Sequence, residues 1–376
     1  MKRIFHIADT HIGYSAYRKL DEATGLNQRE VDTCSAFKQF VDHTLKDRPD
    51  AVLHAGDLFD SVRPTNRAIS FALSQILRLS DAKIPFVVIS GNHETPRLKE
   101  TGSVFSLFEH VPDVHVIYEN GYELVELDDL KIHAVPHCDD IEREKKKVRA
   151  RDGFNIAMLH ASVLGTGLPA FMMGEFNEQT ITIADLTDFD YVALGHYHKC
   201  TRVRADAYYA GSTERFSFSE VDGAKGFLEV RLGAAADEKE VIFHTLRTRA
   251  MLDLEPIRCS SLNEHEIKRA MLHRIRECNP RDKVVRLKVQ DMPLHVYHSL
   301  DFDELKRLTR SAVHFELKYE FQTENELLSA ERPAFHSLHA EFDHFVGKYT
   351  LGADINKEKL RAMGSKYMHE WAGDEA

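Results

Sequence analysis

Short clusters of aspartate, asparagine and histidine recur between residues 9 and 198, and they are the part of the sequence best suited to chemistry. The clusters are Asp9-Thr10-His11, Gly56-Asp57, Gly91-Asn92-His93, His160 and Gly195-His196-Tyr197-His198. Carboxylate, amide and imidazole groups mixed in this way suit Mn, Fe or Zn, whereas a dedicated Mg or Ca cage uses oxygen ligands. The clusters therefore predict a metal site if the fold brings them together.

Each cluster follows a run typical of a β-strand, and amphipathic helical stretches lie between the early runs. The expected strands are Ile4–Ala8, Ala51–Ala55, Phe86–Ile89, Lys131–Val135, Asn155–His160 and Tyr191–Leu194, and the expected helices are Glu30–Leu45 and Thr65–Leu79. Strands that alternate with helices predict an α/β core. Ligand sites in such cores lie at the carboxyl ends of the strands, where these clusters fall.

Three further histidines, His6, His54 and His133, lie inside the strand patterns and are expected to be packed rather than to bind metal. The five cysteines are widely spaced and include no C-x-x-C pair, so reduced thiols are expected. A net charge of −11 argues against an overall basic nucleic-acid binder, although a basic groove can lie within an acidic total. No signal peptide or membrane span is expected, and a cytoplasmic, nucleoid-associated location is predicted.

The chain after residue 225 changes in texture. Strand runs at 226–232 and 241–248 precede an expected small α+β unit of strand 251–257, helix 261–278, strand 283–290, helix 302–310 and strand 313–321, in a βαββαβ-like order or a close variant. A helix-loop-helix follows. The expected domains are 1–250, 251–325 and 326–376.

The order D-x-H, G-D-x-x-D, G-N-H-E, H and G-H-x-H resembles the calcineurin-like metallophosphoesterase superfamily. More narrowly, it is similar to the SbcD nuclease family, whose archaeal and eukaryotic relatives are called meiotic recombination eleven. The segments that carry the resemblance are Ile7–Gly13, Ala55–Asp60 with Arg63-Pro64, Ile89–Glu94, Ala193–His198 and Tyr209–Arg215. The resemblance implies an α/β fold with a two-layered β-sandwich flanked by helices, a small α+β cap domain and a C-terminal helix-loop-helix.

The resemblance also implies roles for the clustered residues. Asp9, His11 and His198 would hold one metal ion, Asn92, His160 and His196 the other, and Asp57 would bridge two Mn²⁺ per subunit, with Mg²⁺ or Fe²⁺ as alternatives. His93 would be the catalytic acid that serves the leaving oxygen. Asp60 stands where archaeal and eukaryotic relatives usually have histidine, and it is expected to hydrogen-bond His93. Glu94 stands where aspartate is more usual in the family.

Basic residues near the metal motifs are expected to contact DNA phosphates. They are Arg63, Arg67, Arg97, Lys99, Lys199, Arg202 and Arg215. The basic run from Arg143 to Arg151 could do the same, but a solvated helix face is the favoured interpretation.

The resemblance further implies a partner, an SMC-like coiled-coil ABC ATPase of SbcC or Rad-fifty type. The aromatic residues expected to dock on it are Phe342, Phe345, Tyr349, Tyr367 and Trp371; folding of this segment onto its own core is the alternative. A homodimer through helices near 65–79 and 103–110 is also implied. The implied activity is Mn-dependent 3′ to 5′ exonuclease and single-strand or hairpin endonuclease action. A phosphatase, a cyclic-nucleotide phosphodiesterase and a DNA-end tethering scaffold remain as alternatives.

Overall fold

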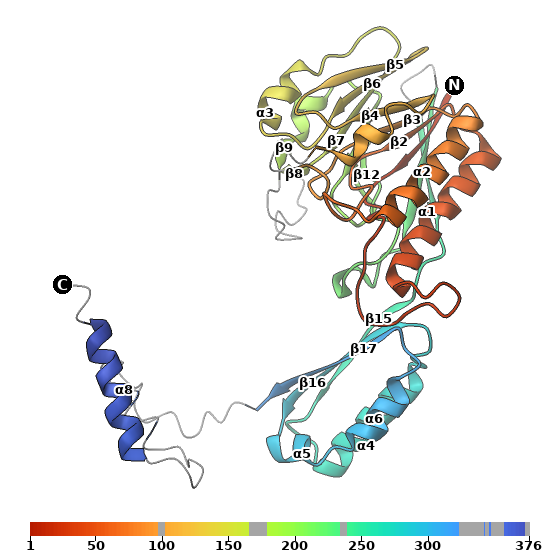
Figure 1. Cartoon of the computed structure of the whole chain (residues 1–376). Coiled ribbons are helices and arrows are strands. Elements are labelled where there is room, and N and C mark those ends of the chain that lie inside the picture. The colour runs from red at the N-terminus through yellow and green to blue at the C-terminus, as the bar shows by residue number, and fades with distance from the viewer. Residues whose placement is uncertain are drawn as a thin grey trace. The chain divides into compact units, whose positions relative to one another are not determined.

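The structure is a computed structural model. It describes residues 1–96, 102–164, 179–233, 239–322, 342, 346 and 357–372, with the side chains of 183, 185 and 366–372 left out. Contacts within the chain group residues 1–320 into one compact unit and residues 321–376 into another. Figure 1 shows the elements of each unit.

Two six-stranded sheets form the centre of the first unit. The order of the first sheet is β14 (Lys239–Thr245), β13 (Gly226–Leu232), β1 (Lys2–Ile7), β2 (Ala51–His54), β3 (Phe86–Ile89) and β4 (Val114–Ile117). The order of the second is β11 (Thr201–Arg204), β12 (Ala207–Tyr209), β10 (Tyr191–Gly195), β7 (Phe154–His160), β6 (Leu130–Val135) and β5 (Glu123–Leu127). A smaller sheet pairs β8 (Ser162–Leu164) with β9 (Thr180–Thr182).

The two large sheets pack face to face, and helices cover their outer faces. Apolar side chains of both sheets, including Leu53 and Ile132, share one buried cluster. The outer face of the first sheet is covered by α1 (Gln28–Asp47) and α2 (Asn66–Asp81), and that of the second carries α3 (Ile141–Glu144). The predicted α/β fold with a helix-flanked β-sandwich is therefore confirmed.

The side chains at the start of each long helix explain where it begins. The side chain of Asn27 accepts a hydrogen bond from the backbone of α1, and that of Thr65 caps α2 in the same way. Short 3₁₀ turns complete the unit: η2 (Val104–Leu107), η3 (Lys145–Lys147), η4 (Ile183–Leu186) and η5 (Phe218–Glu220).

The strands that precede the polar clusters run parallel within their sheets. In the first sheet, β1, β2 and β3 are parallel neighbours. In the second sheet, β7 and β10 are parallel, with Gly195 opposite His160. The carboxyl ends of three strands from one sheet and two from the other therefore supply the candidate site.

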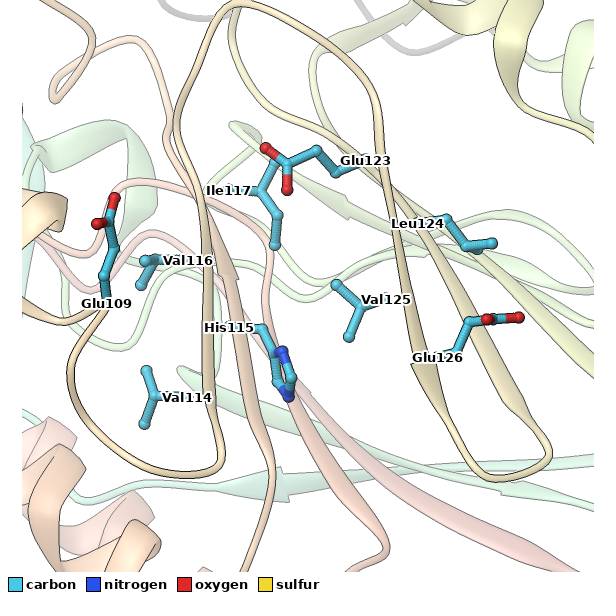
Figure 2. A pocket seen from close by; sticks show the side chains of 9 residues that line it. All are labelled: Glu109, Val114, His115, Val116, Ile117, Glu123, Leu124, Val125 and Glu126. Carbon is cyan, nitrogen blue, oxygen red and sulfur yellow. The ribbon is translucent and has the colours of Figure 1, made fainter.

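Strand β4 forms one edge of the first sheet and β5 forms one edge of the second. Neither strand was predicted from the sequence. A pocket of about 410 Å³ lies between them (Figure 2). Its walls come from 114–117 on one side and 123–126 on the other, with Glu109 at the rim. The pocket contains none of the residues predicted to bind metal or DNA.

The α+β unit has a three-stranded sheet of its own. Its elements are β15 (Met251–Arg258), α4 (Glu264–Glu277), β16 (Val284–Met292), α5 (Leu294–His298), α6 (Phe302–Thr309) and β17 (His314–Phe321). A separate core, including Ile267 and Leu287, joins the sheet to its helices. The order is βαβααβ rather than βαββαβ, because the chain after Pro293 forms α5 instead of a fourth strand.

The second unit contains α8 (Lys357–Ala372) and, before it, helical Phe342 and Val346. The ring of Phe342 lies so close to Gly364 that a Cβ atom there would overlap it. Phe342 therefore contacts α8 within this unit, and the rest of the first expected helix, apart from Val346, lies outside the described residues. Over the described residues, no helix is both long and apolar enough to cross a membrane.

Candidate metal centre

The fold brings the five polar clusters together, although His11 and His198, which are in contact, are 187 residues apart in sequence. Asp9 and His11 follow β1, Asp57 follows β2, and Asn92 and His93 follow β3. His160 ends β7, while His196 and His198 follow β10. The site thus lies where the carboxyl ends of both sheets meet.

Ligand atoms in this site point at one another. Those of Asp9, His11 and His198 all lie within 4.8 Å of one another, as do those of Asp9, Asp57 and His160. The Nε2 atoms of His11 and His198 are 3.2 Å apart. Two imidazole nitrogens at this separation are close enough to bind one cation together.

Asn92 lies on the other side of the same cluster. Its Oδ1 atom is 3.0 Å from Nε2 of His160 and 3.2 Å from Nδ1 of His196. Nε2 of His160 is also 3.3 Å from a carboxylate oxygen of Asp57. All seven residues predicted to bind metal therefore meet in one place, and their donor set of imidazole nitrogens and carboxylate or amide oxygens fits a divalent transition metal.

Three positions in the motifs require glycine because atoms of neighbouring loops lie too close for a side chain. A Cβ atom at Gly56 would overlap the His160 ring, one at Gly91 would overlap the Asp57 carboxylate, and one at Gly195 would overlap the carbonyl of Ala55. Gly56 alone of these three has a left-handed φ, of +94°. The glycines thus leave room for the ligands of neighbouring loops.

Four of the clustered residues are held in unusual backbone conformations. The φ angles of Asp9, His11, Asp57 and His196 are 51°, 44°, 55° and 96°. Residues other than glycine adopt this region seldom, and where they do in clusters the surrounding structure must enforce it. Backbone hydrogen bonds from Asp9 to Gly56, and from His11 to Asp57, supply that enforcement.

Burial shapes the electrostatics of the two aspartates. Asp9 and Asp57 are buried, and burial raises the pKa of Asp9. Burial also acts to raise the pKa of Asp57, but the neighbouring His160 imidazole outweighs it and holds that pKa well below its usual value. The amide of His196 donates to Asp9 at 3.0 Å and that of His93 to Asp57 at 3.1 Å. Buried carboxylates held in this way are suited to a bound cation.

His93 and Asp60 contact one another. Nδ1 of His93 lies 3.1 Å from the backbone carbonyl of Asp60. The Asp60 carboxylate lies 3.3 Å from Nδ1 of His11. The side chain of Asp60 is therefore placed to orient a predicted metal ligand.

Glu94 has a role that the sequence analysis did not assign. It is fully buried, and its two oxygens accept the amides of Phe59 at 2.5 Å and Gly91 at 3.0 Å. Burial raises its pKa to about 8. Glu94 thus ties together the loops that carry Asp57 and Asn92, and its position directly after Asn92-His93 was the available signal.

Glu220 and Lys225 were also missed, because neither stands in a metal motif. Oε1 of Glu220 lies 3.2 Å from Nδ1 of His198, and Oε2 lies 2.5 Å from Nζ of Lys225. Although burial acts to raise the pKa of Glu220, the hydrogen bonds from His198 and Lys225 lower it to about 2. The ionised carboxylate is therefore a hydrogen-bond acceptor for His198.

The histidines expected to be packed are buried and bonded within the sheets. His6 contacts the hydroxyl of Tyr191 at 2.9 Å, His54 that of Thr10 at 3.0 Å, and His133 the amide oxygen of Asn155 at 3.1 Å. Their exclusion from the ligand set is consistent with these contacts. All five cysteines are free, as expected.

The residues predicted to contact DNA fall into three groups. Arg63, Arg67, Lys199 and Arg202 are exposed, and Arg67 pairs with Glu30 at 3.4 Å. Arg215 is instead turned inward, where its guanidinium donates to Thr248 and to the carbonyl of Gly223, each at 2.7 Å. Arg97 and Lys99 lie outside the described residues.

The remaining predictions are only partly described. Lys145 pairs with Glu142 and Lys147 with Glu144; the side chains of Glu142 and Lys147 are exposed, whereas those of Lys145 and Glu144 are mostly covered, so the expected solvated face accounts for only part of this run. Of the predicted docking aromatics, Phe342 is half-buried. Phe345, Tyr349 and the side chains of Tyr367 and Trp371 lie outside the described residues.

A family model agrees with this fold and site. The model described as calcineurin-like phosphoesterase matches residues 2–200, which include all seven predicted ligands. The chain therefore belongs to the calcineurin-like phosphoesterase family. The sequence resemblance to that superfamily is confirmed.

Within the family, the chain is similar to archaeal proteins named DNA double-strand break repair protein Mre11. It is 28% identical to that of Saccharolobus solfataricus over 237 residues, 60% of this chain and 58% of the relative. It is 32% identical to that of Haloferax volcanii over 302 residues, 77% of this chain and 62% of the relative. The match to the Aeropyrum pernix protein is 33% identical over 218 residues, 55% of this chain and 51% of the relative. The matches thus span roughly half to three-fifths of these relatives' own length.

Proposed function

We propose that this chain is a metal-dependent nuclease that hydrolyses DNA phosphodiesters in double-strand break repair. The observation that carries the proposal is the convergence of Asp9, His11, Asp57, Asn92, His160, His196 and His198 at one end of the paired sheets. Similarity to proteins named for double-strand break repair supports DNA as the substrate.

The proposed centre holds two Mn²⁺ ions, with Mg²⁺ or Fe²⁺ as alternatives. Asp9, His11 and His198 would hold one ion, and Asn92, His160 and His196 the other, with Asp57 shared. This division agrees with the grouping of Asp9 with His11 and His198, and with the contacts of Asn92 to the other two histidines. Such cations polarise phosphoryl oxygens and lower the pKa of bound water.

His93 is proposed to give a proton to the leaving oxygen. Its ring centroid lies 4.7 Å from that of His11, at the edge of the ligand cluster. Donation from Nδ1 to the carbonyl of Asp60 fixes the ring, so Nε2 is the nitrogen that would exchange the proton. Proton donation of this kind contributes roughly 10² to 10⁴ in rate.

DNA binding is proposed to depend on exposed cations near the site. Arg63 follows the Asp57 loop, and Lys199 and Arg202 follow the His196 loop. Contacts of this kind to phosphates are independent of base sequence and weaken with salt. The proposed activities are 3′ to 5′ exonuclease action and endonuclease action on single strands or hairpins. Phosphate contacts that do not read the base sequence are consistent with both.

Two associations belong to the same proposal. An SMC-like coiled-coil ABC ATPase would dock on the second unit. This unit, residues 321–376, is separate from residues 1–320 by its internal contacts. A second copy of the chain would pack on α2 and η2, where Leu77 and Leu107 are 40% and 54% exposed. The proposed location is the cytoplasm, at the nucleoid.

The nuclease proposal is tested with labelled duplex and hairpin DNA, and with p-nitrophenyl and bis-p-nitrophenyl phosphate, in Mn²⁺, Mg²⁺ or EDTA. We expect Mn²⁺-dependent cleavage of DNA and of the diester. His196→Ala should abolish it, and His273→Ala, which removes an exposed histidine from α4, should not. Cleavage of the monoester alone would contradict the nuclease proposal.

That last result would favour a phosphatase, whereas cleavage of cyclic nucleotides in place of DNA would favour a cyclic-nucleotide phosphodiesterase. The α+β unit at 251–321 argues for a larger substrate, since a small phosphoester needs no added sheet beside the core. DNA binding without any hydrolysis would favour a tethering scaffold.

A further inference from the structure

A short stretch after the last metal motif contacts both the metal centre and the α+β unit. It runs from Phe216 to Val221, contains η5, and is named the coupling segment here. The centroid of the Phe216 ring lies 4.7 Å from that of His11 and 5.3 Å from that of His198. The hydroxyl of Tyr14 donates to the carbonyl of Phe216 at 3.2 Å, which fixes this end of the segment.

Glu220, at the other end of η5, holds His198 directly. One oxygen of the carboxylate accepts a hydrogen bond from Nδ1 of His198 at 3.2 Å, and the other accepts one from Nζ of Lys225 at 2.5 Å. Lys225 also donates to the backbone carbonyl of His198 at 2.8 Å. The side chains of Glu220 and Lys225 are only 9% and 2% exposed, so this arrangement has little freedom. It leaves Nε2 of His198 directed at His11.

The opposite side of the coupling segment packs on the α+β unit. Phe218 and Val221 contact a buried cluster formed by Met251, Val284 and Val313, one residue from each of three parts of that unit. The guanidinium carbon of Arg286, on β16, lies 4.3 Å from the centroid of the Phe218 ring. Arg286 is itself fixed by Asp253 on β15, with nitrogen to oxygen distances of 2.9 and 2.6 Å.

We infer that the coupling segment transmits the seating of the α+β unit to His198, with Glu220 as the positioning residue and the Phe218–Arg286 contact as the link. A shift of β16 moves Phe218, and Glu220 is two residues away in the same turn. A histidine ligand whose second nitrogen loses its partner binds metal less tightly. The inference rests on the metal site of the proposed function. It adds that the position of the α+β unit alters the metal affinity of that site through His198.

The inference is tested by Mn²⁺ binding, measured by calorimetry on the full chain. Glu220→Ala should weaken binding roughly tenfold, because His198 loses its Nδ1 partner. Glu220→Gln should fall between the parent and Glu220→Ala, since the amide keeps an acceptor oxygen but places an NH₂ group at Lys225. Arg286→Ala, far from any ligand in sequence, should weaken Mn²⁺ binding roughly threefold.

The matched control is Lys288→Ala. Lys288 is two residues from Arg286 on the same strand and pairs with the same Asp253 carboxylate, at 3.3 Å. It should bind Mn²⁺ as the parent does. Phe218→Leu, which keeps apolar volume but removes the ring, should reproduce Arg286→Ala and guards against a folding defect in that variant. Thermal melts by circular dichroism identify variants that are merely destabilised.

Parent-like Mn²⁺ affinity in Arg286→Ala and Phe218→Leu would overturn the coupling, and parent-like affinity in Glu220→Ala would overturn the positioning role. Equal losses in Arg286→Ala and Lys288→Ala would also overturn the coupling, because they would trace the effect to Asp253. These outcomes are separate from failure of the proposed function. A parent chain that binds Mn²⁺, shows the expected order of variants and leaves DNA uncut would contradict the nuclease and support the coupling.

Discussion

Individual residues in the metal centre are constrained more tightly than their motifs suggest. Asp9, His11, Asp57 and His196 all have left-handed backbones, each at a cost on the order of 1 kcal/mol. Around them, glycines occupy positions where any side chain would strike a ligand or its loop. The free energy of the rest of the fold must offset this strain, so ligand geometry is set by the backbone as much as by the side chains.

Gly195→Ala tests this at one position. Its Cβ would meet the carbonyl of Ala55 and the ring of His160, so we expect a loss of roughly 1 to 3 kcal/mol in unfolding free energy and weaker Mn²⁺ binding. Urea melts and calorimetry measure the two effects. Gly223→Ala is the control, because Gly223 also lacks a left-handed φ and an added Cβ there would meet nothing closer than the carbonyl of Glu220 at 3.8 Å. Equal behaviour of the two variants would show that contact at Gly195 does not matter.

His93→Ala separates proton donation from metal binding. We expect cleavage of labelled DNA, whose leaving alkoxide needs a proton, to fall by roughly 10² to 10⁴, and cleavage of bis-p-nitrophenyl phosphate to fall much less because p-nitrophenolate leaves without one. Metal content by elemental analysis should stay unchanged, although the structure also groups His93 with His11 and Asp57. Loss of metal together with activity would make His93 a ligand instead of an acid.

The site could be predicted from sequence because its ligands stand in short motifs with fixed spacing. The roles of Glu220 and Lys225 could not be predicted. These residues are 22 and 27 positions after His198 in sequence, and only the fold of the chain between them brings them into contact with it. Arg215 was predicted to face DNA from its closeness to a motif, yet its guanidinium is committed to Thr248 and Gly223. Proximity in sequence does not fix the direction of a long side chain.

At the level of elements, the strands with clear apolar runs were predicted, including the edge strand β14 at 241–248, whereas the short strands β4 and β5 were not. β13 was expected at the residues it occupies, because Phe227, Leu228, Val230 and Leu232 give the run a β-rich apolar character although Glu229 and Arg231 interrupt it. β4 and β5 are four and five residues long; β4 buries Val114 and Ile117 and β5 buries only Val125, so too few positions remain for a clear pattern. The five elements expected in the α+β unit are all present, and the short helix α5 after Pro293 is an addition that the sequence analysis did not predict.

The hairpin of β13 and β14 should make stability depend on pH. Burial acts to raise the pKa of Glu229, but hydrogen bonds from Arg231 at 2.8 Å and His244 at 2.7 Å lower it overall. A carboxyl with a lowered folded pKa adds stability above its unfolded pKa of about 4.5, and that stability is lost as pH falls through the folded value.

Glu229→Gln should therefore be less stable than the parent at pH 7, and the difference should shrink as pH falls below about 4.5. Urea melts of both proteins in EDTA, at several pH values, measure this without interference from metal. Glu240→Gln, which affects a more exposed carboxylate on the same hairpin, is the control and should change stability little. A difference between parent and Glu229→Gln that stays constant with pH would contradict the expectation.

At the level of the whole molecule, the chain divides into a catalytic part and a terminal part. Residues 1–320 include the metal centre, the α+β unit and the coupling segment between them. Residues 321–376 form their own contacts, and Phe342 against Gly364 joins their two described helical stretches. The sequence analysis expected three domains, 1–250, 251–325 and 326–376, and that finer division stays a prediction.

Deletion of residues 332–376 tests what the terminal part does. Because residues 321–376 make most of their contacts with one another, we expect the truncated chain to keep Mn²⁺-dependent cleavage. Its melting temperature should equal that of the full chain. Co-purification with the coiled-coil ATPase should be lost, since the docking helices are gone. The full chain with Gly364→Leu, which would push against Phe342 without shortening the protein, should weaken co-purification as well. Unchanged co-purification of the truncated chain would contradict docking, and a clearly lower melting temperature would show that the segment folds onto its own core.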